Sequence, residues 1–363
     1  MSFKAKDQFH SKRYHIYHLT DSVNEGGMAR NRAFHEKFLS LNAIQINVYS
    51  KNIAKRFWMA IHTLLLLIFA RNKNLFIHQG SLLVLFPIFF MKIPFLRKLV
   101  FSLLNRAAKR NKLILEVNDL PYEQSIDLEL EVHEIYKIIQ DGFYSIKECH
   151  YVFASNEMAA YISSKYSIKE LYINVIINGA PQLCDYSSIF TNEQWVNSEK
   201  TKFVYAGSLN KGRQIEDLLN IFSKDQHNLL IVLGNEGEWL NAVELPENII
   251  YLGNFQEKEA HYLVSKCDIG IIPYNEDRFY YNLCFPTKVS FYLTAGLPIL
   301  STPLKELQQV FKNEAALLFV SFDKWSTVIE NISKNEVMIM KESAKIIKES
   351  YSWKFLLNKG KID

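Results

Sequence analysis

One segment of the sequence has the composition of an anion-binding helix start, Phe285–Leu300 (FPTKVSFYLTAGLPIL). Thr287 is placed to cap a helix, and Gly296 is placed to end it after about two turns. The N–H groups at such a start and its partial positive charge suit a diphosphate. Lys288, in the first turn, adds a mobile cation. The alternative is a plain capped helix followed by a strand.

A second phosphate-binding candidate follows the apolar run 203–205. The small residues Gly207 and Ser208 allow backbone N–H groups to approach a phosphate. Lys211 or Arg213 can neutralise that phosphate. Taken alone, the same residues also fit an ordinary tight turn after a strand.

Asp119 is the candidate catalytic residue. It follows the strand expected at 112–117, and polar groups at the carboxyl ends of parallel strands line ligand crevices. A structural role at the strand end has equal weight.

The cysteines and acidic residues indicate no metal centre. The four cysteines have neither metal-type nor redox-type spacing, so we interpret them as reduced thiols of a cytosolic protein. No cluster of metal ligands is visible, and we expect no required cofactor. The polar, basic start (MSFKAKDQFHSKRYH) lacks the apolar core of a signal peptide, which predicts a cytoplasmic protein.

Apolar runs alternate with helical patterns along the whole chain. Strands are expected at 15–19, 44–49, 75–78, 112–117, 151–154, 173–177, 203–205, 229–233, 249–252, 269–272, 299–301 and 316–320. Helices are expected near 28–41, 54–70, 82–106, 128–146, 157–166, 215–222, 258–265, 288–295, 304–311 and 337–357. This alternation predicts an α/β protein with two Rossmann-like parallel-sheet domains facing a cleft.

The expected domain boundaries follow from composition. Residues 1–180 form an N-terminal domain, the polar stretch 182–200 a linker, and residues 201–336 a C-terminal domain. The last part, 337–363, is expected to form a helix that crosses back to the first domain.

Charge is distributed unevenly along the chain. Residues 1–112 contain 19 Lys and Arg against 4 Asp and Glu, and no acidic residue lies between Lys37 and Leu115. Such asymmetry indicates that the first domain meets an anionic surface. The apolar run Phe57–Ala70 is too short to cross a bilayer of about 30 Å. A basic amphipathic helix at the membrane surface fits better, with an ordinary solvated face as the alternative.

Nucleic acid is the rival anion. The basic residues stand among aliphatic runs rather than single stacking aromatics, and no nucleic-acid-binding motif is present. We therefore expect no nucleic-acid partner.

The ordered set of motifs resembles glycosyltransferases with two Rossmann-like domains (GT-B type), especially the retaining family 4. The segment Phe285–Leu300 has the family's Pro-x-Lys-(Leu/Val) start and Ala-Gly-Leu-Pro finish, and 267–274 (CDIGIIPY) is similar to the strand before it. The run 203–212 (FVYAGSLNKG) resembles the opening of the family's donor domain. Further similarities are the Ser155, Asn178-Gly179 and Tyr351-Ser352-Trp353 motifs.

The resemblance also gives roles to residues of the first domain. Gly26 and Gly27 match the family's double-glycine loop between donor and acceptor. A dehydrogenase loop is the alternative, but the G-x-G-x-x-G pattern is absent. Asp119 would lie on the acceptor side or position the sugar.

The sequence departs from the family at two positions. Family 4 members often carry two glutamates, eight residues apart, where this chain has Leu283 and Phe291. These acids are associated with the donor sugar and the ribose hydroxyls. Asn282 and Asn275 are possible replacements as hydroxyl partners; ordinary loop roles are the alternative. Some bacterial polysaccharide and adhesin-glycosylating transferases look similar here, which favours a divergent branch.

The resemblance implies a retaining, hexosyltransferase-type enzyme that uses a nucleotide-diphosphate sugar as its donor. Because the basic, apolar region belongs to the acceptor-type domain, we expect a saccharide acceptor linked to lipid, in cell-surface polysaccharide or glycoconjugate synthesis. The protein would then be peripheral on the inner face of the cell membrane. Two alternatives remain: a sugar-nucleotide epimerase, and a catalytically silent partner subunit of another transferase.

Overall fold

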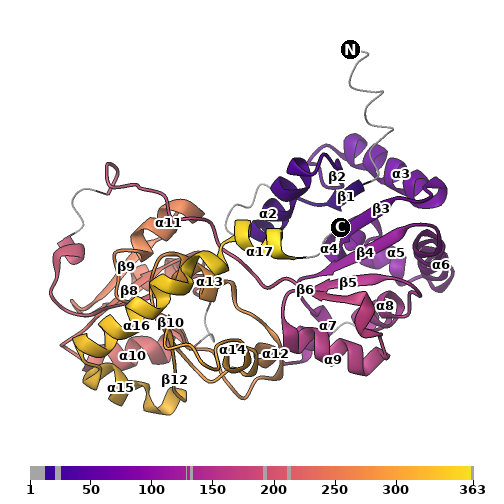
Figure 1. The fold of residues 1–363 in the computed structure, drawn as a ribbon. Coiled ribbons are helices and arrows are strands. Elements are labelled where there is room, and N and C mark those ends of the chain that lie inside the picture. The colour runs from indigo at the N-terminus through magenta and orange to yellow at the C-terminus, as the bar shows by residue number, and fades with distance from the viewer. Residues whose placement is uncertain are drawn as a thin grey trace. The chain divides into compact units, whose positions relative to one another are not determined.

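The chain folds into two compact units, each built around its own sheet. A computed structural model describes residues 13–20, 26–127, 129–130, 134–190, 194–210 and 214–360. Unit 1 comprises Met1–Ile177 with Lys359–Asp363, and unit 2 comprises Asn178–Asn358. In each unit, strands lie side by side with helices on both sides (Figure 1).

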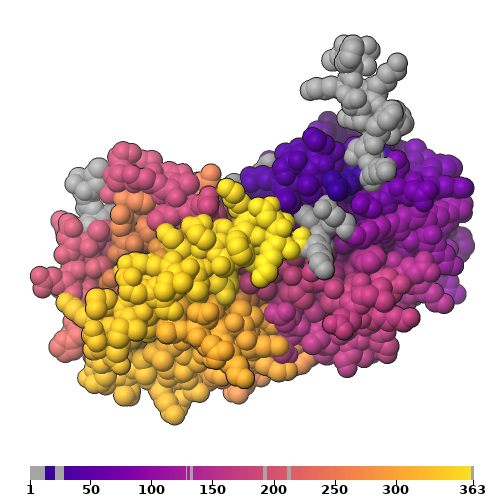
Figure 2. All heavy atoms as spheres, in the orientation of Figure 1, coloured from indigo at the N-terminus to yellow at the C-terminus, as the bar shows by residue number. Residues whose placement is uncertain are grey.

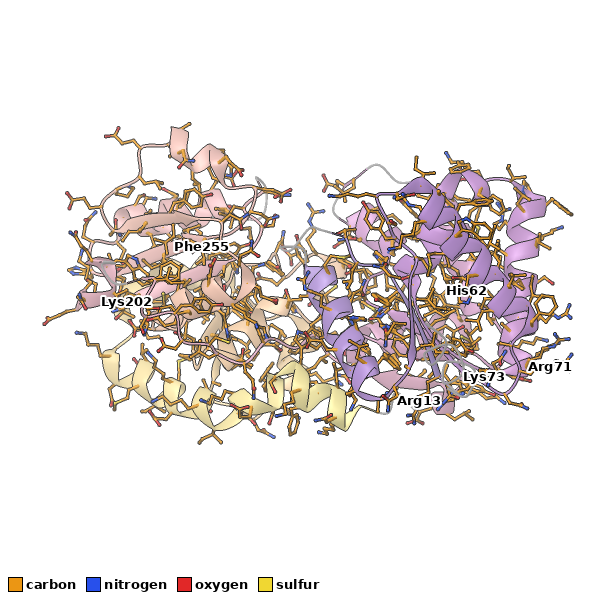
Figure 3. The ribbon with its side chains drawn as sticks, turned by 90° about the horizontal axis from the view of Figure 1, so that it is seen from above. Arg13, His62, Arg71, Lys73, Lys202 and Phe255 are labelled. Atoms are coloured by element: carbon orange, nitrogen blue, oxygen red, sulfur yellow. The ribbon has the colours of Figure 1, made fainter. Side chains whose placement is uncertain are left out.

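The sheet of unit 1 has six parallel strands in the order β2-β1-β3-β4-β5-β6. They are β1 (Arg13–Tyr17), β2 (Ile44–Asn47), β3 (Asn74–His78), β4 (Lys112–Val117), β5 (His150–Phe153) and β6 (Ile173–Val175). Their apolar side chains are buried between the helix layers, as expected for a parallel sheet covered on both faces. Arg13 begins β1 opposite Asn74, so Arg13 and Lys73 lie together at the amino ends of these strands (Figure 3).

Unit 1 has eight helices among its described residues. They are α2 (Gly26–Ser40), α3 (Ile53–Phe69), α4 (Gln79–Leu85), α5 (Ile88–Met91), α6 (Pro94–Arg110), α7 (Pro121–Asp127), α8 (Glu134–Tyr144) and α9 (Asn156–Tyr166), with a 3₁₀ turn at Glu170–Tyr172. The long helix predicted over 82–106 is divided into α4, α5 and α6. Proline explains the breaks: Pro87 follows the end of α4, and Pro94 is the first residue of α6.

None of the helices in the described ranges has the length and apolarity that crossing a bilayer requires.

The sheet of unit 2 also has six parallel strands, in the order β12-β11-β10-β7-β8-β9. They are β7 (Lys202–Ala206), β8 (Leu229–Leu233), β9 (Ile249–Gly253), β10 (Ile269–Ile272), β11 (Ile299–Ser301) and β12 (Leu317–Phe319). Phe203, Tyr205, Phe222 and Trp325 anchor the core of this unit. Strands are present at all twelve predicted places, so the predicted α/β class with two parallel sheets is confirmed.

Eight helices of the described residues lie wholly or mostly in unit 2. They are α10 (Ile215–Lys224), α11 (Glu257–Val264), α12 (Phe279–Leu283), α13 (Thr287–Thr294), α14 (Lys305–Val310), α15 (Trp325–Asn331), α16 (Lys334–Ile347) and α17 (Trp353–Lys359), with 3₁₀ turns at Gln194–Asn197, Glu238–Ala242, Phe322–Lys324 and Lys348–Tyr351. Helix α16, in yellow, lies on the face of unit 2 that is turned to the viewer (Figure 2).

The helix predicted over 337–357 is interrupted in the structure. The 3₁₀ turn Lys348–Tyr351 ends α16, and α17 starts after Ser352. Ser352 pairs with Ala180, whose carbonyl oxygen accepts from the Trp353 N–H at 3.0 Å. This contact takes the backbone out of the helix, and a partner so distant in sequence has no signal in the local pattern. Whether the C-terminal segment crosses back to the first domain stays a prediction.

Candidate functional site

The predicted phosphate-binding helix is α13, and its start differs in detail from the prediction. Pro286 is the N-cap residue and makes no side-chain capping bond, while Thr287 is the first residue inside the helix. The prediction that Thr287 caps the helix is therefore wrong: Pro286 has the extended backbone that a cap requires, and the helix begins one residue earlier than assumed. The N–H groups of the first turn still mark this end as a place for negative charge.

Lys288, in the first turn of α13, lies against the end of β7. Its side chain is buried, with 8% of its surface exposed. Its Nζ donates to the Tyr274 hydroxyl at 3.0 Å and lies 5.0 Å from the centre of the Tyr205 ring and 5.3 Å from that of Tyr274. We call Tyr205, Gly207, Tyr274 and Lys288 the Lys288 cluster. In this cluster the ammonium group of Lys288 is held at the carboxyl edge of the sheet.

Sequence reasoning missed the two tyrosines of the Lys288 cluster. Tyr205 is in β7, and Tyr274 follows β10, the neighbouring strand. Tyr281 stacks on Tyr274 with ring centres 4.7 Å apart. A detectable signal was the position of Tyr274 just after a buried strand, where parallel strands place ligand-binding groups.

Two glycines bring the ends of β7 and β8 close together. A Cβ atom on Gly234 would overlap the carbonyl oxygen of Gly207, and both residues have positive φ, +147° and +150°. The Gly207 N–H donates to the Leu233 carbonyl at 3.0 Å. The absence of side chains leaves the backbone half-buried beside Lys288, and a phosphate-binding turn needs such close access to its backbone.

Ser208, the next predicted residue, has an acidic neighbour. Its hydroxyl contacts a carboxylate oxygen of Glu236, from the loop after β8, and lies 2.6 Å from the Asn210 side-chain oxygen. Lys211 and Arg213, predicted as phosphate partners, lie outside the described residues.

Asn178, the first residue of unit 2, hydrogen-bonds to residues on both sides of the start of α13. Its Nδ2 donates to the Phe285 carbonyl at 3.0 Å, and its own carbonyl accepts from the Ser290 hydroxyl at 2.5 Å. A Cβ on the following Gly179 would lie 2.8 Å from the Trp353 ring. The Asn178-Gly179 motif therefore positions the helix start and packs against α17.

The two positions where family 4 has glutamates are apolar sites in the structure as well. Leu283 is buried, and Phe291 is half-buried with its ring centre 4.7 Å from that of His261. The amide of Asn282 donates to the carbonyls of Glu276 and Arg278, while its oxygen accepts from the Lys305 N–H at 2.9 Å. These bonds brace α12 against α14; a role of Asn282 toward substrate hydroxyls stays a prediction.

The candidates of the first half lie in unit 1, at the carboxyl edge of its sheet. Gly26 and Gly27 are the first residues of α2. Asp119 is exposed after the end of β4, and its carboxylate accepts from the Asn118 side-chain amide at 2.7 Å. The structure thus groups the Lys288 cluster with Ser208 and Thr287 in unit 2, and leaves Gly26, Gly27 and Asp119 in unit 1.

Among the described residues, neither metal-binding side chains nor reactive thiols extend the candidate site. The described ranges contain no group of three or more His, Cys, Asp or Glu side chains that could hold a metal ion. Cys149 and Cys267 are buried, and burial raises the pKa of both thiols, so they are poor nucleophiles.

Comparison with known proteins connects this geometry to a family. Residues 203–359 match the family model described as "Glucosyltransferase 3-like, C-terminal domain". The match begins in β7 and ends with α17, so it includes the whole Lys288 cluster. No curated protein sequence matches the chain significantly.

Solved structures similar over nearly the full length include three carbohydrate-related proteins. Sucrose-phosphate synthase from Thermosynechococcus elongatus is 10% identical, with 96% of this chain and 97% of that chain covered and a TM-score of 0.67. WaaG, a glycosyltransferase involved in lipopolysaccharide biosynthesis, is 12% identical over 95% and 98%, with a TM-score of 0.63. Anabaena HepE in complex with UDP-glucose is 11% identical over 95% and 97%, also with 0.63.

The chain has the GT-B fold of glycosyltransferases. Within this GT-B fold, residues 203–359 are similar to the Glucosyltransferase 3-like C-terminal domain. The Lys288 cluster lies inside that domain.

Proposed function

We propose that the chain is a glycosyltransferase that moves a sugar from a nucleotide-diphosphate sugar to a saccharide acceptor. One observation carries the proposal: the buried ammonium of Lys288 lies beside the half-buried glycine turn at Gly207 and in the first turn of α13. A fixed cation, a glycine turn and a helix start at one strand edge are the elements of a diphosphate site. The domain match over the same residues supports this function.

The same groups would promote the chemical step. When the bond between the anomeric carbon and the diphosphate oxygen breaks, that oxygen gains negative charge. A preorganised cation and N–H dipoles stabilise such charge more in the transition state than in the ground state. Lys288, the amides of α13 and the turn at Gly207 and Ser208 would hold the phosphates, together with Lys211 and Arg213. The sugar nucleotide is then the donor substrate, and no cofactor is required.

Similarity to other proteins supports a choice of donor and a stereochemical outcome. HepE was solved with UDP-glucose, which makes UDP-hexoses the first donors to test. The resemblance to retaining family 4 supports retention of the anomeric configuration, which NMR of the product's anomeric proton would establish. In unit 1 we assign Gly26, Gly27 and Asp119 to the acceptor side, because they lie at the carboxyl edge of the sheet.

We further propose that unit 1 attaches to an anionic membrane surface and that the acceptor is linked to lipid. The apolar helix α3 buries only Thr63 and Leu67. Its large exposed side chains are Ile53, Phe57, Trp58, Leu65 and Phe69, with exposed fractions of 48% to 80%. Such a helix is stable in water only at a cost, which a lipid interface would remove.

Helices α5 and α6 extend this apolar surface next to α3. Helix α6 packs on both α3 and α5. Phe89, Ile93, Phe95 and Leu99 are exposed on α5 and α6. We call the exposed apolar residues of these three helices the apolar face.

Basic residues lie in the same stretches of sequence as the apolar face. They are Lys51, Lys55, Arg56, Lys92, Arg97 and Lys98, in a stretch that contains no acidic residue. Cations beside exposed aromatic and aliphatic side chains match an anionic lipid headgroup layer above hydrocarbon. The similarity to WaaG, which takes part in lipopolysaccharide biosynthesis, supports a role in cell-surface glycoconjugate synthesis on the inner face of the membrane.

A donor panel separates this function from its alternatives. Nucleotide diphosphate release is measured from UDP- and other nucleotide sugars, with and without a membrane extract as the source of acceptor. Acceptor-dependent release supports transfer. Formation of an isomeric sugar nucleotide without acceptor would show an epimerase instead, and no release from any donor would point to a silent partner subunit.

A further inference from the structure

Four buried side chains in unit 1 form a continuous chain of polar contacts beneath the carboxyl edge of its sheet. Arg30 Nε donates to Glu116 Oε1 at 2.5 Å, and His78 Nδ1 lies 2.7 Å from Glu116 Oε2. His78 Nε2 lies 2.8 Å from His15 Nε2. Each of the four side chains is at most 2% exposed. None of them belongs to the residues proposed to touch substrate.

The chain of contacts continues from His78 through His15 to Gln45. The Gln45 side-chain oxygen lies 2.7 Å from His15 Nδ1, so this nitrogen donates. Burial, aided by His78, lowers the pKa of His15 well below its usual value. Its Nε2 and the Nε2 of His78 share one hydrogen bond.

The electrostatics of Glu116 agree with this arrangement. Burial opposes the ionisation of this carboxyl, but the charges of Arg30 and His78 outweigh it and lower its pKa to about 2. Arg30, His78 and Glu116 therefore form a buried triad in which both partners hydrogen-bond to one carboxylate. Replacing such a group by well-packed apolar residues is often neutral or stabilising, so stability alone does not explain it. Its directional hydrogen bonds fix the relative positions of the segments that carry these residues.

The triad joins the segments of unit 1 that we assign to the acceptor side. Arg30 lies one turn after Gly26 and Gly27 in α2. Glu116 is in β4, two residues before Asn118. Arg30 also donates through Nη1 to the Ile176 carbonyl at 2.8 Å, just after β6. One guanidinium thus connects the start of α2, the end of β4 and the end of β6.

We propose that Arg30 and Glu116 are positioning residues, which hold the helix start at Gly26 and Gly27 in register with the strand end at Asn118 and Asp119. The proposal rests on the acceptor-side role given to these segments above. Transfer requires the groups around the acceptor to stay within a fraction of an ångström of their productive places, and a displacement of about 1 Å can cost roughly 100-fold in rate.

The test uses Arg30→Lys in the full chain. Lysine keeps the charge but not the fork that binds Glu116 and Ile176 together. Amide hydrogen exchange at residues 28–33 and 118–120 should rise at least about tenfold, with exchange in β7 and β8 unchanged. Acceptor-dependent transfer should fall roughly 100-fold, while the KM for the donor stays within about twofold. Unchanged exchange at both segments would overturn the proposal.

A double variant separates positioning from stability. Arg30→Met with Glu116→Leu replaces the pair by apolar side chains, and because His78 loses its carboxylate partner, transfer is measured at a temperature where the variant remains folded. We expect its transfer to remain low; full transfer would show that the pair is only structural. The control Lys165→Met breaks the Lys165–Glu123 ion pair of the same unit (2.8 Å) and should leave transfer unchanged. If the wild type itself shows no transfer, the proposed function fails, and the exchange result still decides the positioning role.

Discussion

A Cβ atom on Gly207 would lie 2.5 Å from the Nζ of Lys288. The glycine therefore has two roles at once, because its φ of +150° disfavours other residues and its missing side chain gives space to the cation. We expect Gly207→Ala to displace the ammonium and raise the KM for the donor by about tenfold or more. Donor-dependence of the initial rate measures this.

Gly253 provides the control for Gly207→Ala. It also has a positive φ, +92°, at the end of β9, but a Cβ there would have open space. Gly253→Ala should lose about 1–2 kcal/mol of unfolding free energy while leaving the donor KM unchanged. Equal donor KM values for the two variants would mean that strain, rather than contact with Lys288, is responsible.

Chelation tests whether protein groups alone stabilise the leaving diphosphate. Because Lys288 and the first turn of α13 are proposed to supply the positive charge, EDTA should leave the rate within about twofold of the untreated enzyme. A loss of activity that Mg²⁺ or Mn²⁺ restores would show that a metal ion shares this role.

The apolar face of α3, α5 and α6 predicts binding to anionic vesicles. Flotation with phosphatidylglycerol vesicles should recover the protein at low salt, and neutral phosphatidylcholine vesicles should not. Phe57→Ser with Trp58→Ser should weaken binding at least about tenfold, because two large exposed side chains lose their insertion into lipid. Ile346→Ser, which removes an 82% exposed side chain from α16, is the control and should bind normally. Equal recovery from both vesicle types would contradict the attachment.

The buried His261 predicts a loss of stability in mild acid. Burial lowers its pKa from 6.5 to about 4, although its bond to the Phe291 carbonyl opposes the shift. Below pH 6.5 His261 is protonated in the unfolded chain, whereas in the folded chain it stays neutral down to about pH 4. The unfolding free energy should therefore fall by about 3 kcal/mol over this window from this group. Urea unfolding should show a smaller fall in His261→Gln, and an identical fall would refute the assignment.

Local patterns were sufficient for the strands and for the presence of α13, although they misplaced its cap by one residue. Buried parallel strands are continuous apolar runs, and Gly296 and Lys288 are strong local signals around α13. Patterns failed where distant segments meet. The break before α17 depends on Ala180, and Tyr205 and Tyr274 approach Lys288 only through the strand order β10-β7. The Arg30–Glu116 pair joins residues 86 positions apart, so no spacing in the sequence indicates it.

Substitution of Lys288 tests the central claim most directly, and the chain contains a matched control. Lys202 is also buried in unit 2, 9% exposed, but lies at the amino end of β7 (Figure 3). It contacts the Ser198 carbonyl at 2.9 Å and Asp268 at 3.5 Å. Acceptor-dependent release of nucleotide diphosphate should fall at least about 100-fold in Lys288→Ala and remain near the wild-type rate in folded Lys202→Ala. Wild-type turnover by Lys288→Ala would contradict the account.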